Sequence, residues 1–315
     1  MAKLLKEAQD YLIVKPDHSY QLLFQPHDIS TLDPSLQLQW HITKMRAAIA
    51  TNHNHQGLKL ITQLFALGEQ TVFKQEVREA FRLSGILLRK MGYWPQAQQS
   101  YQCALNFTAK ESERVGLLIN RAVLARHQGQ YPQARAFYKE AERIAKYYDN
   151  QRALAAIYNN LGSLQLDLGD LKGAEQFYRQ ALGGFQQTDK RSGNITAGTN
   201  LLLIFAINGD LVNFQRLLGP IETYVRHHPD QAKKALMQWL KAADWHNQGK
   251  FISSSKRTKL VEAYHQLDSV KLKQLVARYL APKLNIELQA PTPSTPITQP
   301  PAPWFNELAR CFAMT

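Results

Sequence analysis

Five glycines recur at an almost fixed interval through the middle of this 315-residue chain. The gaps between them are 37, 40, 40 and 40 residues, and each glycine ends a stretch with helical periodicity. A period of this length is typical of stacked repeat arrays, in which each unit buries its apolar face against its neighbours. The spacing therefore predicts a solenoid, which offers a long surface to a partner more often than a compact catalytic pocket. The five residues are Gly92, Gly129, Gly169, Gly209 and Gly249.

The segments around Gly169 indicate what one repeat contains. Leu161 and Leu164 before it, and Ala174 and Tyr178 after it, are spaced as on one face of a helix. Apolar residues at this spacing predict two amphipathic helices that bury one stripe each. Glycine adopts the left-handed backbone that ends a helix, so Gly169 is expected to separate the two.

The same register recurs in the neighbouring copies. Phe81, Gly85, Trp94, Ala97 and Tyr101 surround Gly92, and Ala122, Tyr131, Ala134, Tyr138 and Ala141 surround Gly129. This order of small residue, glycine, aromatic residue and alanine resembles the tetratricopeptide repeat over about residues 70–250. The resemblance implies an all-α, right-handed superhelical solenoid of about seven antiparallel helix hairpins. The 40-residue period exceeds the family's usual 34 and resembles bacterial peptide-sensing and regulatory members.

Composition and pattern divide the chain into five regions. Residues 1–69 are expected to form degenerate helical hairpins that continue the stack, and Asp33-Pro34 is a helix start with an Asp N-cap. Residues 70–250 hold the repeats and 251–288 form basic capping helices. Residues 289–303 are a proline-rich linker that cannot form a helix, and 304–315 are a short apolar tail.

The tail carries apolar residues at helical spacing, which suits either a docking motif for a partner or the protein's own groove, or simple packing on the last helices. These residues are Trp304, Phe305, Leu308 and Phe312.

An asparagine column is the strongest candidate for a ligand site. Asn120, Asn160 and Asn200 each stand nine residues before a glycine. An amide both donates and accepts hydrogen bonds, so such a column could grip the backbone of an extended peptide. The alternative is that the asparagines pack and hydrogen-bond between helices. The same register adds five groove neighbours, namely Asn159, Ser163, Arg82, Arg89 and Arg126.

The arginines have two interpretations. Arg82 and Arg89 precede Gly92 on one predicted helix, and their forked guanidinium groups suit a carboxylate terminus. They could equally be solvated surface residues.

The net charge of +13 is concentrated near the C-terminal end of the repeats. Residues 231–283 hold eleven Lys or Arg and three acids. Such a segment is either a solvated face or a surface for nucleic acid, an acidic protein or an anionic membrane. Nucleic-acid binding is the alternative function, with bases stacked on aromatic residues, most of which their periodic placement assigns to the core. These aromatic residues are Trp239, Trp245, Phe251, Tyr264 and Tyr279.

No catalytic signature, cofactor motif or metal-binding spacing stands out. His53 and His55 in one turn, and His227 and His228 in another, are expected to be exposed loop residues. The N-terminus does not resemble a secretory signal, and no apolar run is long enough to cross a membrane. Cys103 and Cys311 form no disulfide framework, which favours the cytoplasm. The sequence thus predicts a non-catalytic, cytoplasmic scaffold that binds a protein or a short peptide.

Overall fold

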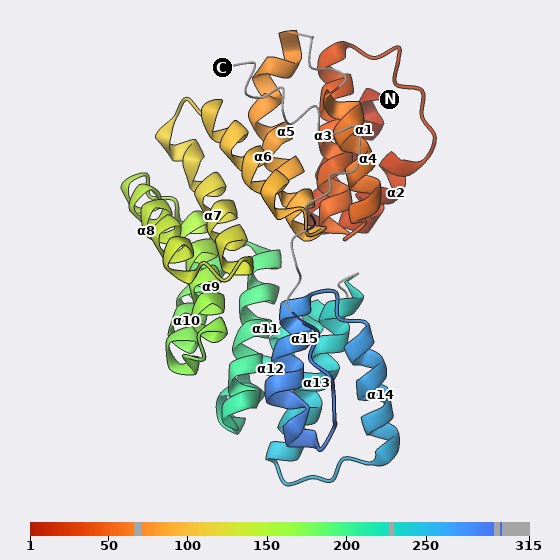
Figure 1. Cartoon of the computed structure of the whole chain (residues 1–315). Helices are drawn as coiled ribbons and strands as arrows, with labels where there is room; N and C mark the ends of the chain where they lie inside the picture. The colour runs from red at the N-terminus through yellow and green to blue at the C-terminus, as the bar shows by residue number, and fades with distance from the viewer. Residues whose placement is uncertain (66–70, 227–229, 293–296, 298–315) are drawn as a thin grey trace. The chain divides into compact units, whose positions relative to one another are not determined.

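The computed structural model describes residues 1–65, 71–226, 230–292 and 297. These residues are mostly helical and contain no β-strand, which confirms the all-α class (Figure 1). The described α-helices are α1 (Ala2–Val14), α2 (Pro16–Phe24), α3 (Pro34–Ala50), α4 (Asn54–Phe65), α5 (Thr71–Lys90), α6 (Trp94–Asn106), α7 (Glu111–His127), α8 (Tyr131–Tyr147), α9 (Gln151–Asp167), α10 (Leu171–Gln187), α11 (Arg191–Asn208), α12 (Leu211–Arg226), α13 (Gln231–Asn247), α14 (Ser254–His265) and α15 (Val270–Leu275).

The chain forms two compact units. The first comprises residues 1–148 together with Ile297, and the second comprises residues 149–294. Consecutive helices pair as hairpins within each unit, as the pairs α7–α8 and α9–α10 show in Figure 1. The first unit contains the pairs α1–α2, α3–α4, α5–α6 and α7–α8, and the second contains α9–α10, α11–α12 and α13–α14. The prediction of about seven hairpins is confirmed in the described residues.

The five periodic glycines end helices, as predicted. All five have φ between 73° and 86°, the left-handed region that suits glycine. We call the helix before each glycine the first helix of its repeat and the helix after it the second helix. The second helix begins two residues after Gly92, Gly129, Gly169 and Gly209, but α14 begins five residues after Gly249.

A glycine and a tyrosine set the close approach of two helices in a hairpin. A Cβ atom at Gly162 of α9 would lie 2.7 Å from Cδ1 of Tyr178 on α10, so only glycine allows this contact. Tyr178 is buried, and its hydroxyl donates to Oγ of Ser163 at 3.1 Å. Gly85 and Tyr101 repeat the arrangement between α5 and α6. The small residue and the aromatic residue of the repeat are therefore partners.

The N-terminal region begins its third helix where the sequence indicates. Asp33 caps α3, since its Oδ1 accepts from the backbone N–H of Ser35 at 2.8 Å, and Pro34 is the first helical residue. Trp40 of α3 is buried in a cluster with Leu5 and Leu23 of the first two helices.

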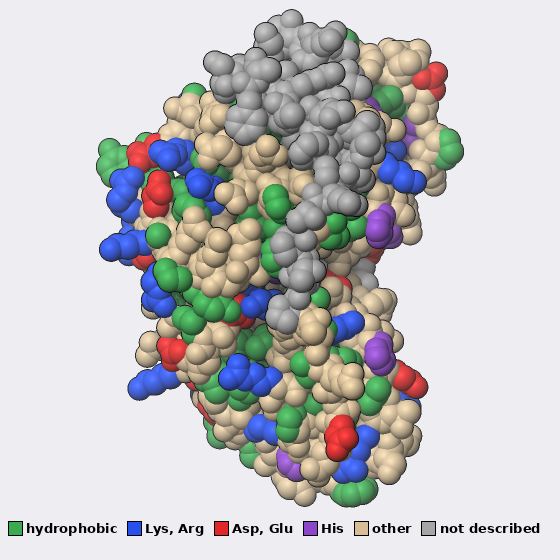
Figure 2. Space-filling model, viewed as in Figure 1, with side chains coloured by type: hydrophobic (Ala, Val, Ile, Leu, Met, Phe, Trp, Pro, Cys, Tyr) green, Lys and Arg blue, Asp and Glu red, His purple; other side chains and the backbone are tan. Residues whose placement is uncertain are grey.

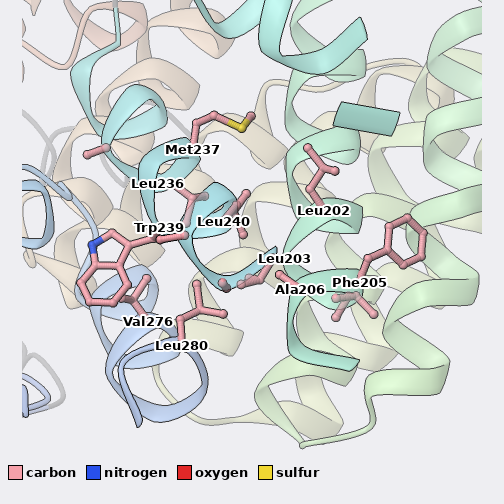
Figure 3. Packing of buried hydrophobic residues seen from close by; sticks show 14 of the residues in the cluster. Leu202, Leu203, Phe205, Ala206, Leu236, Met237, Trp239, Leu240, Val276 and Leu280 are labelled. Carbon is pink, nitrogen blue, oxygen red and sulfur yellow. The ribbon is translucent and has the colours of Figure 1, made fainter. Parts of the chain in front are cut away.

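The C-terminal segment of the second unit covers part of its first helices. After α15 the chain makes a π-helical turn, Val276–Leu280, which lies against α11 and α13. Val276 and Leu280 pack with Trp239 of α13, as Figure 3 shows. This segment packs against α11 together with α9, α10, α12 and α13, and the residues Leu201–Ala206 of α11 are all buried.

Cys103 is the one cysteine in the described residues. It is buried and disulfide-bonded. The sequence predicts no disulfide framework, and at Cys103 this prediction is wrong, because Cys103 is not a free thiol.

Candidate functional site

Polar contacts join the first helices of successive repeats at a spacing close to the repeat period. In the second unit, Asn159 contacts Asn200, and the side-chain amide of Asn247 donates to the carbonyl of Ala206 at 3.0 Å. Both contacts span 41 residues. Polar side chains therefore link the first helices of successive repeats, once to a side chain and once to a backbone carbonyl.

The central contact of the second unit is an amide pair. Nδ2 of Asn200 on α11 donates to Oδ1 of Asn159 on α9 at 3.1 Å, and both residues are half-buried. Asn160, the predicted member of the column, instead donates to the carbonyl of Ala156 on its own helix at 2.8 Å. The pair thus joins Asn200 to the residue before the predicted one. Asn120 is half-buried on α7 of the first unit.

Ser163 supports the amide pair from within the hairpin. Its hydroxyl donates to the backbone carbonyl of Asn159 at 3.1 Å and accepts from the hydroxyl of Tyr178. Ser163 therefore links α9 to α10, and its hydroxyl uses both roles inside the protein.

Arg82 of α5 is held by a carboxylate of its own helix. Its Nε and Nη2 donate to Glu79 at 2.6 and 2.7 Å, and Arg46 of α3 donates to the same carboxylate. Burial alone would raise the pKa of Glu79, but hydrogen bonds and charges from Arg82 and Arg46 outweigh it and lower that pKa. Sequence reasoning missed Glu79, although its spacing of three residues from Arg82 is a known helix pairing.

Arg89, at the end of α5, is placed differently from Arg82. Its Nη1 lies 3.4 Å from Nε2 of His127 on α7, and its Nε is buried without a hydrogen bond. Burial raises the pKa of the Tyr101 hydroxyl, while the nearby guanidinium of Arg89 opposes that shift. No ion pair with a carboxylate joins Arg89 within the described residues. Arg126 precedes His127 on α7, and its Nε is also buried.

The charged surface is mixed. Basic and acidic side chains are interspersed over the face shown in Figure 2. Arg114 pairs with Glu140 at 3.4 Å and Arg143 with Glu111 at 2.6 Å, which joins α7 to α8. Exposed pairs of this kind contribute little, about 0–1 kcal/mol each.

The aromatic residues of the basic segment divide into two groups. Trp239 and Tyr264 are buried in the core and are not accessible for stacking on bases, and Tyr279 packs against that core. Trp245 and Phe251 are 43% and 80% exposed.

Several other predicted features have plain outcomes. Nδ1 of His53 lies at hydrogen-bond distance, 2.8 Å, from the hydroxyl oxygen of Thr51, and the ring of His53 stacks on that of Tyr20. Across the described residues, no group of three or more His, Cys, Asp or Glu could hold a metal ion, and no helix is long and apolar enough to span a membrane. The predicted docking tail and the pair at 227–228 lie outside the described residues.

The fold defines a helical-repeat protein of the kind that binds other proteins or peptides. Residues 113–187, from α7 to α10, match the model of the tetratricopeptide repeat. This part of the chain therefore consists of tetratricopeptide repeats.

Two solved structures are similar in fold. BtubC (BKLC) from P. vanneervenii has 20% identity and a TM-score of 0.50, with coverage of 69% of this chain and 89% of that one. A Rap protein complexed with Competence and Sporulation Factor has 14% identity and a TM-score of 0.47, with coverage of 90% and 91%. No curated protein sequence matches the chain.

Proposed function

We propose that this chain is a non-catalytic scaffold that binds a short peptide, or an extended segment of a partner protein, along its first helices. The observation that carries the proposal is the amide pair of Asn159 and Asn200, which bridges two repeats and is half-buried. The pair uses one N–H of Asn200 and the oxygen of Asn159. No hydrogen bond of the described residues occupies Nδ2 of Asn159 or Oδ1 of Asn200. A donor and an acceptor side by side match one peptide group of a ligand.

The two hydrogen bonds that the amide pair can offer are too weak to hold a ligand by themselves. Two hydrogen bonds contribute about 1–3 kcal/mol net, which is less than the ~4.1 kcal/mol of millimolar binding. The amide pair would therefore fix the register of a bound backbone, while pockets for its side chains supply most of the affinity. In the first unit, Arg89 is suited to a carboxylate because it carries a buried N–H group and no acidic partner among the described residues.

The test is selection of peptides on the full chain, followed by binding measurements on variants. Asn159→Ala and Asn200→Ala should each weaken a selected peptide by about five- to tenfold, the loss expected for one hydrogen bond. Asn106→Ala is the matched control, because Asn106 is exposed on the second helix α6. Equal affinity in all three variants would refute the proposed contact.

A second measurement covers variants that fail to fold. Hydrogen exchange on the unaltered protein should show slower exchange in α9 and α11 when the selected peptide is bound. Protection confined to other helices would place the ligand elsewhere.

The nucleic-acid alternative has less support, since Trp239 and Tyr264 are core residues. Binding that falls steeply with salt concentration is expected for nucleic acid and not for the peptide scaffold. Peptide sensing by a regulator, and a cytoplasmic location, stay predictions.

A further inference from the structure

A groove of about 810 Å³ opens in the second unit where α12, α13 and α14 meet. Its volume is in the range of about 300–1,000 Å³ that is typical of ligand sites. It is lined by Leu211, Gln215, Leu218, Gln238, Lys241, Asp244, Trp245, Gln248, Lys250, Lys256, Lys259 and Leu260.

The groove is separate from the amide pair of Asn159 and Asn200. It is also separate from the side of α13 that Val276 and Leu280 cover. Gln238, Lys241 and Trp245 line it and share one face of α13 by helical spacing. Trp239 lies on the other side of the helix, under Val276 and Leu280.

Departures from the repeat pattern explain why this space exists. Three copies carry a buried tyrosine nine residues after the glycine, namely Tyr101, Tyr138 and Tyr178. The fourth copy carries Leu218 at this position. Leucine fills less volume than tyrosine, and Leu218 lines the groove. The late start of α14 also leaves residues 250–253 without helix beside the end of α13. Both departures occur in the two copies where the repeat pattern is weakest.

Lysine side chains give the groove a positive rim. Lys241 pairs with Glu222 at 2.7 Å, whereas no ion pair of the described residues involves Lys250, Lys256 or Lys259. The ammonium groups of Lys250 and Lys256 lie 4.9 and 4.0 Å from the ring centre of Trp245. Lys250 also acts electrostatically on the carboxylate of Asp244, while Lys256 has no ion pair in the described residues. An incoming carboxylate would therefore meet positive charge beside an apolar face.

A buried carboxyl group adds a polar contact point. Asp244 is 5% exposed, and its Oδ2 accepts from Gln215 and Gln248, each at 2.6 Å. Its Oδ1 is buried without a hydrogen-bond partner in the described residues. A buried acceptor of this kind is costly when unsatisfied, and an N–H donor from a ligand would satisfy it.

Two exposed apolar residues are sequence neighbours of lining residues. Phe251 follows Lys250 in the chain and is 80% exposed, and Val212 follows Leu211 and is 69% exposed.

We propose that this groove binds an acidic peptide segment of a partner protein that carries one large apolar side chain. The apolar side chain lies on Trp245 and the leucines, and the acidic side chains meet Lys250, Lys256 and Lys259. A backbone N–H of the segment faces Asp244. A polynucleotide fits less well, because three leucines of the lining offer nothing to phosphates.

The direct test uses short fluorescein-labelled peptides with a central Phe, Leu or Trp flanked by Asp and Glu, added to the full chain. Versions with Asn and Gln in place of the acids, and an oligothymidylate, are the comparison ligands. At least one acidic peptide should bind about tenfold more tightly than its neutral version and than the oligonucleotide. Failure of every acidic peptide, or tighter binding of the oligonucleotide, overturns the proposal.

Variants then locate the site. K250E/K256E should weaken the best peptide by at least about tenfold. K139E/K172E changes the net charge by the same amount at two exposed lysines outside the lining, and should leave affinity within about twofold. Equal losses in both double variants would show only a general charge effect.

A spectroscopic readout keeps the test independent of charge. The peptide should shift Trp emission to shorter wavelength in the unaltered protein, and Trp245→Phe should remove that shift. A shift that persists in W245F would place the ligand on another tryptophan. Since neither Asn159 nor Asn200 lines the groove, N159A/N200A should bind the acidic peptide normally, which separates this proposal from the first-helix site.

Discussion

Replacing Gly162 by alanine should destabilise the α9–α10 hairpin, although alanine favours helix more than glycine does. A Cβ atom at this position would lie 2.7 Å from Cδ1 and Cε1 of Tyr178. Tyr178 is 1% exposed, so its ring cannot turn into solvent. An ordinary contact needs about 3.5–4.0 Å, so the ring or the helix must move by roughly 1 Å.

The expected change in the free energy of unfolding combines one stabilising effect and two destabilising effects. Glycine to alanine inside a helix gains about 0.5–1 kcal/mol. Overpacking in a filled core costs about 1–3 kcal/mol, and losing the hydrogen bond from Tyr178 to Ser163 costs about 0.5–1.5 kcal/mol. The net expectation is a loss of about 0.5–4 kcal/mol, centred near 2 kcal/mol, since the packing effects exceed the helix gain.

Gly183→Ala is the matched control for this change. Gly183 lies inside α10, and no heavy atom lies within 4 Å of the Cβ position there. This variant should gain about 0.5–1 kcal/mol, because only the helix preference acts.

The assay is urea unfolding followed by circular dichroism, with hydrogen exchange of α9 and α10 as the local measurement. Exchange is needed because the chain has two compact units, and a single global transition is not assured for such proteins. Tyr178→Leu should reduce the cost of G162A, since the smaller side chain no longer meets the added methyl group.

The opposite outcome is easy to recognise. If G162A were as stable as G183A, the helices would not be in the tight contact described, and the glycine–tyrosine pairing would be the wrong explanation of the repeat.

Three further predictions concern other parts of the chain. Gly169→Ala should lose about 1–2 kcal/mol in the same unfolding assay, because φ is +84° there; no loss would contradict the left-handed cap. Burial, with a smaller contribution from Lys44, lowers the pKa of His41 from 6.5 to about 4. The unfolded state then binds more protons, so stability should fall by up to about 3 kcal/mol as pH falls from 6.5 to 4, and H41Q should flatten that fall in pH-dependent unfolding. Lys271→Ala should cost about 1 kcal/mol and speed hydrogen exchange in Val276–Leu280, because Lys271 donates to Asp167 at 3.0 Å; unchanged exchange would contradict this anchoring role.

Local physics made much of the fold predictable. Helix ends depend on nearby groups, so Gly169 with its left-handed backbone and Asp33 with its capping carboxylate could be read directly from the sequence. Helical spacing likewise identified the buried faces, including Ala174 and Tyr178. The repeat family followed from the same positions.

Contacts between helices were harder to predict. Asn200 was expected in a column with Asn160, yet its partner is Asn159, because a small rotation of one helix changes which neighbouring side chain meets the next layer. Nothing in the sequence indicated that Oδ1 of Asp244 is buried without a hydrogen bond, because its surroundings form only where α12, α13 and α14 meet.

The sequence by itself determined the repeat, its helices, its turns and the two helices of each hairpin, since these depend on residues close together in the chain. Only the tertiary structure decided which polar groups pair between repeats, that Val276 and Leu280 cover Trp239, and that a lysine-rimmed groove opens beside Trp245. These outcomes depend on the angles and distances at which helices pack, and those are set by the volumes of many side chains acting together.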